Sequence, residues 1–175
     1  MSYGQNMQPM AGAAPAGGAA PADNRLPFSL GIGGSALALL GSCLAWTSVS
    51  MEGFPGDETV AGIDGDGVFT LITSILAIAA FVTGMVKRNN KIAAFSLVPS
   101  LVTLVFAVLN FLDPKRLARS YAEDQVDAEV TSEQLDQFLE GYDFSTAFGL
   151  YLVIIGVLAA LAGGVMTAMK ARSSQ

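Results

Sequence analysis

Four long apolar stretches alternate with polar segments along the chain. They cover residues 27–48, 68–86, 92–112 and 146–169, and none of them contains Asp, Glu, Lys, Arg or His. An α-helix rises about 1.5 Å per residue, so the longest stretch reaches roughly 36 Å and can cross a hydrocarbon core ~30 Å thick. The pattern predicts an all-α membrane protein with four transmembrane helices.

Small residues recur at regular spacing in the first and fourth stretches. A row of small side chains lets another helix approach closely, which is how helices pack in a membrane. We expect this packing to occur either within the chain or against a partner. The candidate helix-packing residues, most of them seven apart, are Gly34, Gly41, Gly149, Gly156 and Gly163.

The middle two stretches are joined by only five residues, 87–91. Such a short connection predicts an antiparallel helical hairpin. Pro99 lies inside the third stretch, where its ring and its missing N–H predict a kink.

The first polar loop, residues 49–67, contains the run Asp64-Gly65-Asp66-Gly67, which is part of a calcium-loop pattern. In that register, Gly62 and Thr73 occupy the first and twelfth ligand positions, and neither carries a carboxylate. We therefore expect a turn in which Asp66 caps the next helix, and no metal or other cofactor.

The second polar segment, residues 113–145, predicts a small helical module with helices over 115–129 and 132–140. Thr131 and Gln134 fit a capping box, and Gly141 fits a helix stop. Apolar residues recur at helical spacing along the second of these helices and just beyond it. The apolar stripe that they form must face the first loop, the bilayer surface or another protein. These partner-docking candidates are Leu135, Phe138, Leu139 and Tyr142.

Residues 1–26 form a tail whose Gly/Ala/Pro composition predicts disorder. The segment Leu40-Gly41-Ser42-Cys43 resembles a bacterial lipobox. However, no basic residue precedes Arg25, and apolar residues follow Cys43. A thiol packed on a helix is therefore the expected alternative to lipidation.

Charge is distributed unevenly between the segments that separate the apolar stretches. The tail, residues 87–91 and residues 170–175 carry six basic residues and one acidic residue, whereas loops 49–67 and 113–145 carry three basic and fourteen acidic residues. Basic residues remain on the cytoplasmic side. The chain is thus expected in a bacterial plasma membrane, with both termini in the cytoplasm and the acidic loops on the outer side.

Two further groups belong to the outer side in this arrangement. Trp46, Phe69, Phe111 and Tyr151 fall near the outer interface, as an aromatic belt would. The basic residues Lys115, Arg116 and Arg119 lie just outside the third stretch. They are expected either to pair locally, as Arg119 with Glu123, or to contact lipid headgroups or an acidic partner.

Composition limits the chemistry that the chain can perform. It has 52% hydrophobic and 14% charged residues, no His and a single Cys, which excludes internal disulfides and His-based catalysis. Proton-coupled transport needs ionisable groups at membrane depth, and the apolar stretches have none. We expect a protein that is not an enzyme and that binds no nucleic acid.

Four apolar stretches, a tail that begins MSYGQ, and a Gly-Asp-Gly turn before the second stretch resemble the small uncharacterised four-span membrane proteins of high-GC Gram-positive bacteria. The resemblance implies an accessory subunit of a respiratory or envelope complex.

The leading hypothesis is a non-catalytic accessory or scaffold protein. It would contact membrane lipids and other membrane subunits, or itself, and dock a partner through its acidic outer loops. The alternatives are a small oligomeric channel or transporter subunit and an envelope sensor.

Overall fold

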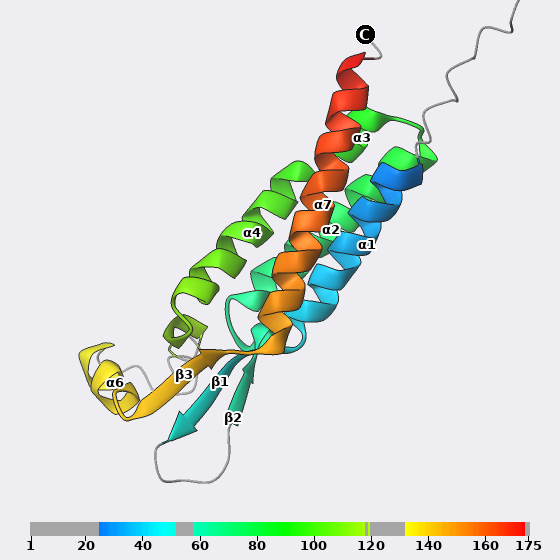
Figure 1. Cartoon of the computed structure of the whole chain (residues 1–175). Coiled ribbons are helices and arrows are strands. Elements are labelled where there is room, and N and C mark those ends of the chain that lie inside the picture. Colours follow the sequence, from blue (N-terminus) through cyan, green and yellow to red (C-terminus); the bar gives the residue numbers. More distant parts are fainter. Residues whose placement is uncertain (1–24, 52–57, 118, 120–131, 174–175) are drawn as a thin grey trace, which may run out of the picture.

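The computed structural model describes residues 25–51, 58–117, 119 and 132–173, and it is a bundle of helices that carries a small sheet at one end (Figure 1). The expectations for residues 1–24 of the tail, for most of the 115–129 helix and for the Thr131 cap lie outside the described residues, whereas Arg25 and Leu26, expected in the tail, belong to the first helix. The elements are α1 (Arg25–Ser42), β1 (Ala45–Met51), β2 (Glu58–Ala61), the 3₁₀ turn η1 (Gly62–Asp64), α2 (Gly67–Val86), α3 (Asn90–Ala94), α4 (Leu97–Leu112), α6 (Ser132–Leu139), β3 (Tyr142–Thr146) and α7 (Phe148–Ser173).

The polarity of the bundle is the reverse of that in a water-soluble protein. Large apolar side chains such as Ile75, Leu101 and Ile155 are about half exposed, whereas Gly, Ala, Ser and Thr fill much of the buried interior. A surface of this kind is stable in lipid, where apolar side chains need no cover. Three segments are long and apolar enough to cross a membrane, Gly67–Val86, Asn90–Leu112 and Phe148–Ser173. The chain is therefore a multi-pass membrane protein.

The first predicted span differs from the observed helix. Helix α1 ends at Ser42, whereas the expected span continued to Ser48. Residues 45–51 are instead strand β1, in which Trp and Val favour extended backbone and two neighbouring strands complete the hydrogen bonds. Helix α1 is short and rich in Gly and Ser, and it is not among the three segments named above.

A three-stranded antiparallel sheet replaces the expected all-α architecture at one end of the bundle. Strand β1 is central, in the order β2-β1-β3. Ser48 pairs with Thr59 of β2 and with Ser145 of β3. Loops 49–67 and 113–145, predicted as an irregular loop and a helical module, therefore meet in one sheet.

Helix α6 matches the predicted second helix of the module, but the apolar stripe does not continue along it. The helix ends at Leu139, and Tyr142 begins strand β3. A turn at Glu140 and Gly141 redirects the chain into the sheet. Tyr142 consequently does not share a helical face with Leu135, Phe138 and Leu139.

The helix that contains Pro99 is interrupted one turn before the proline. Helix α3 ends at Ala94 and α4 begins at Leu97, so Pro99 lies in the first turn of α4, where its missing N–H costs little. The N–H of Val98 donates to the carbonyl of Phe95, four residues before the proline, at 3.2 Å. The expected kink thus takes the form of a break at residues 95–96.

Candidate functional site

The five helix-packing glycines lie in the contact between α1 and α7, or at its ends. A Cβ at Gly34 would lie 2.5 Å from the backbone N of Ala160, and one at Gly156 would lie 2.5 Å from the backbone N of Ala38. At the two ends of the contact, a Cβ at Gly149 would meet the carbonyl of Ala45 and one at Gly163 that of Pro27, each at 2.6 Å. Backbone therefore touches backbone along the whole length of α1.

This close contact lies within one chain. Gly41 completes the row, since a Cβ there would lie 2.8 Å from the carbonyl of Gly149. Glycines that are already covered by the chain's own helix leave no open stripe for a second protein.

The sheet is attached to this helix pair by the strands themselves and by one aromatic side chain. Two residues separate α1 from β1, and one residue separates β3 from α7. Trp46 is fully buried, and its indole N–H donates to the carbonyl of Gly41 at 2.9 Å. Trp46 also packs in a core with Leu117, Leu150 and Val153. We call β1, β2, β3, η1 and residues 113–117 the sheet cap.

Burial of Trp46 corrects its expected place in an aromatic belt at the membrane surface. The other expected members are half-exposed: Phe69 stacks on Phe106, and Phe111 meets Tyr151 edge to face. Cys43 also differs from the expected packed helix thiol, since it lies just beyond α1 and is exposed.

A polar contact joins the sheet cap to the helices, and it involves residues distant in sequence. The Nε–H of Arg116 donates to Oδ2 of Asp66 at 2.7 Å. The same carboxylate oxygen accepts from Nδ2 of Asn110 at 3.3 Å, and Asn110 is almost fully buried. Asp66 does precede helix α2, but it makes no capping bond with its side chain, contrary to expectation.

Two more contacts hold residues 113–117 against the sheet. Thr47 Oγ1 donates to the carbonyl of Pro114 at 3.2 Å, and Lys115 Nζ lies 5.8 Å from the ring centroid of Phe144. Lys115 and Arg116 thus contact other parts of the same chain, whereas local pairing or lipid contact had been expected. Glu123, the expected partner of Arg119, lies outside the described residues.

The partner-docking candidates end in different environments. Leu139 is buried at 9% exposure, and Tyr142 is half-buried in β3. Leu135 and Phe138 belong to α6, and their side chains are not among those described. On the sheet cap, exposed polar residues include Asp143 and Ser145 on β3 and Glu58 and Thr59 on β2.

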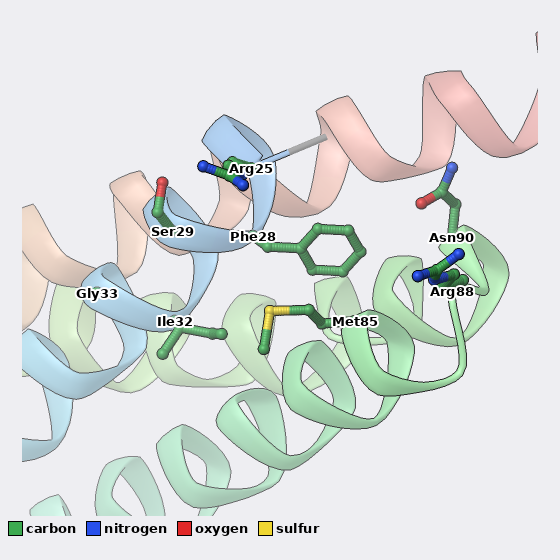
Figure 2. A pocket seen from close by; sticks show the side chains of 8 residues that line it. All are labelled: Arg25, Phe28, Ser29, Ile32, Gly33, Met85, Arg88 and Asn90. Atoms are coloured by element: carbon green, nitrogen blue, oxygen red, sulfur yellow. The ribbon is translucent and has the colours of Figure 1, made fainter. Parts of the chain in front are cut away.

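A pocket of about 920 Å³ lies at the opposite end of the bundle, between α1 and the end of α2 (Figure 2). We call this end the basic end, because α1 begins there with Arg25, residues 87–91 contribute three cations, and α7 ends there with Lys170 and Arg172. The pocket is lined by Arg25, Phe28, Ser29, Ile32, Gly33, Met85, Arg88 and Asn90. Sequence reasoning did not predict it, because its walls come from segments more than fifty residues apart.

The two regions differ in the kind of side chain that they offer to a ligand or partner. No group of three or more Cys, Asp or Glu side chains among the described positions is placed to hold a metal ion. The arrangement offers a sheet with exposed polar residues at one end and a basic, partly apolar pocket at the other. No protein-family model and no curated protein matches the chain.

Proposed function

We propose that the chain is a non-catalytic accessory or scaffold protein of a bacterial plasma membrane, a subunit of a larger respiratory or envelope complex. The observation that carries the proposal is the sheet cap. It is built directly onto the most tightly packed helix pair, so that its orientation is fixed relative to the membrane. A fixed platform outside the bilayer suits a docking role.

The proposal includes four spans, with α1 as the first. Although α1 is less apolar than the other helices, its contact with α7 extends from Pro27 to Gly41. If α7 crosses the bilayer, α1 lies at the same depths. The charge asymmetry between the two ends supports cytoplasmic termini and an external sheet cap.

The edges of the sheet supply the docking surface in this proposal. Strand β1 is paired on both sides, whereas β2 and β3 each have one edge without a strand partner among the described residues. An open edge can accept a further strand from a partner through main-chain hydrogen bonds. Glu58 and Asp143, both exposed, would favour a basic partner segment.

Site-specific photocrosslinking in native membranes tests this role. A photoreactive residue at Ser145, on the exposed edge strand, should give one discrete protein adduct in near-stoichiometric yield. The matched control is the same residue at Ile155, which is 59% exposed on α7 and should contact only lipid. Absence of a protein adduct at Ser145, together with recovery of the protein alone in mild detergent, would contradict the scaffold function.

A channel or transporter subunit is the second candidate, and buried hydroxyl groups are what favour it. The side-chain oxygens of Ser35, Ser74, Ser96 and Ser100 are buried without a hydrogen-bond partner in the described part of the chain. They lie on or beside α1, α2 and α4, and unpaired hydroxyls can accept water or an ion. Ion flux in vesicles that contain only this protein would favour this candidate over a scaffold.

A further inference from the structure

The pocket at the basic end combines two cations with an apolar floor. Arg25 on α1 and Arg88 beyond α2 lie on either side of Phe28, and Met85 and Ile32 line the space between the helices (Figure 2). Phe28 is buried at 7% exposure, whereas Met85 is 47% exposed on a membrane-spanning helix. The wall of the pocket therefore includes Met85, a side chain half-exposed on a helix that is long and apolar enough to cross a membrane.

Arg88 occupies a backbone position that an arginine rarely adopts. Its φ is 50°, the only positive value for a non-glycine residue in the described part of the chain. Two hydrogen bonds close the turn: Asn89 N–H donates to the carbonyl of Gly84 at 2.8 Å, and Arg88 N–H to that of Met85 at 3.2 Å. This is a Schellman motif, in which glycine is the favoured residue. The turn itself does not require an arginine.

Gly33 leaves room in the same pocket. A Cβ at this position would meet nothing within 4 Å, unlike one at Gly31, Gly34 or Gly41 on the same helix. Those three glycines are needed for close packing, but Gly33 is not. Its lack of a side chain widens the pocket on the exposed side of α1.

We propose that this pocket binds one anionic membrane phospholipid. The phosphate would lie between Arg25 and Arg88, since guanidinium groups bind phosphate through paired, charge-assisted hydrogen bonds. One acyl chain would follow Ile32, Gly33 and Met85 into the bilayer. A free phosphate would leave the apolar part of the pocket unfilled, whereas a lipid matches both its charge and its floor.

Native mass spectrometry of the full-length protein in a neutral detergent tests the proposal, with phosphatidylglycerol and phosphatidylcholine of identical chains as probes. Phosphatidylglycerol should bind at one site and more tightly than phosphatidylcholine by about tenfold or more. Arg88→Gly should remove most of this preference. Because glycine suits the positive φ, this variant should unfold at the same temperature as the parent protein or a higher one.

Two further variants separate the pocket from general effects of charge. Gly33→Leu adds a side chain at a lining residue whose Cβ would meet nothing within 4 Å, and it should weaken binding of phosphatidylglycerol by at least about tenfold. Arg172→Gln removes one exposed charge from the same end of the bundle, outside the pocket, and should leave binding unchanged.

Four results would overturn the proposal: equal binding of both lipids, unchanged binding in Arg88→Gly and Gly33→Leu, an equal loss in Arg172→Gln, or a bound segment of the chain's own tail in place of lipid. Glycerophosphoglycerol and inorganic phosphate distinguish the source of the anion. If either binds as tightly as the intact lipid, the pocket is a site for soluble anions and not for phospholipid.

Discussion

Single glycines determine how closely the first and last helices, α1 and α7, pack against each other. At Gly34 and Gly156 the backbones of α1 and α7 are so near that even one added carbon would have to displace main-chain atoms. At Gly33, one position along α1, the same carbon would enter open space. Spacing in the sequence predicted which glycines could pack, but not that they would pack against each other.

Gly156→Ala should therefore destabilise the folded bundle, by about 1–3 kcal/mol, because α1 and α7 must move apart. Gly33→Ala is the matched control and should be neutral or stabilising by up to about 1 kcal/mol, since alanine favours the helix and meets no neighbour. Equilibrium unfolding in mixed micelles measures both. Equal stability of the two variants would contradict the observed helix contact.

Asp66 carries two contacts at once, and its loss should cost more than the loss of its exposed partner Arg116. In Asp66→Ala, the Asn110 amide keeps its bond to the carbonyl of Phe106 at 3.0 Å but loses its carboxylate acceptor, with an expected cost of about 1–3 kcal/mol. Arg116→Met should cost less than about 1 kcal/mol, because the arginine side chain is 44% exposed and solvent screens the pair. Asp64→Asn, at an exposed residue, is the control and should have no measurable effect on unfolding.

The pairing of Asp66 with Arg116 could not be predicted from the sequence. The two residues are separated by fifty positions, and the local pattern around Asp66 fits a helix cap equally well. The position of residues 113–117 against the sheet decides whether Asp66 caps α2 or pairs with Arg116. That position depends on contacts such as the one between Thr47 and Pro114.

Among the elements, the helices were more predictable than the strands. An apolar run of membrane length specifies a helix by itself, because lipid offers the backbone no other hydrogen-bond partner. Residues 45–48 continue such a run, so the end of α1 at Ser42 was missed. A strand is defined by its partners, and the partners of β1 come from residues 58–61 and 142–146.

The pairing of β1 with β3 can be tested directly through the register of the two strands. In a chain with Cys43→Ser, the pair Ser48→Cys and Ser145→Cys should form a disulfide readily, because paired Cα atoms in an antiparallel sheet are about 4.5–5.5 Å apart. Ser48→Cys with Thr146→Cys is the control, since adjacent residues point to opposite faces of a strand. Preferential crosslinking of the control pair would contradict the observed register.

Trp46 reports on the joint between the sheet cap and the bundle, and it is the only tryptophan in the chain. Because it is fully buried, its fluorescence should be blue-shifted and resist quenching by acrylamide in the folded protein. Gly62→Ala should shift the emission toward the red, since a Cβ there would lie 2.5 Å from the indole ring. An accessible indole in the parent protein would contradict the packed joint.

For the whole molecule, insertion into a membrane is the feature that the sequence predicted best. Charge-free apolar runs were sufficient to identify a membrane protein, and three of them lie in helical segments long enough to cross a membrane. The sheet cap and the basic pocket were not predicted, because both arise where distant segments meet. The proposed docking and lipid-binding roles depend on those two regions.

The central claim is that α1 crosses the bilayer together with the other three long helices, so that the sheet cap and the chain's termini lie on opposite sides. Labelling of single cysteines with a membrane-impermeant maleimide, in cells that carry Cys43→Ser, tests it most directly. Ser145→Cys should be labelled in intact cells, whereas Ser2→Cys and Ser173→Cys should be labelled only after permeabilisation. Labelling of Ser2→Cys and Ser145→Cys from the same side would show that α1 does not cross, and would contradict the account.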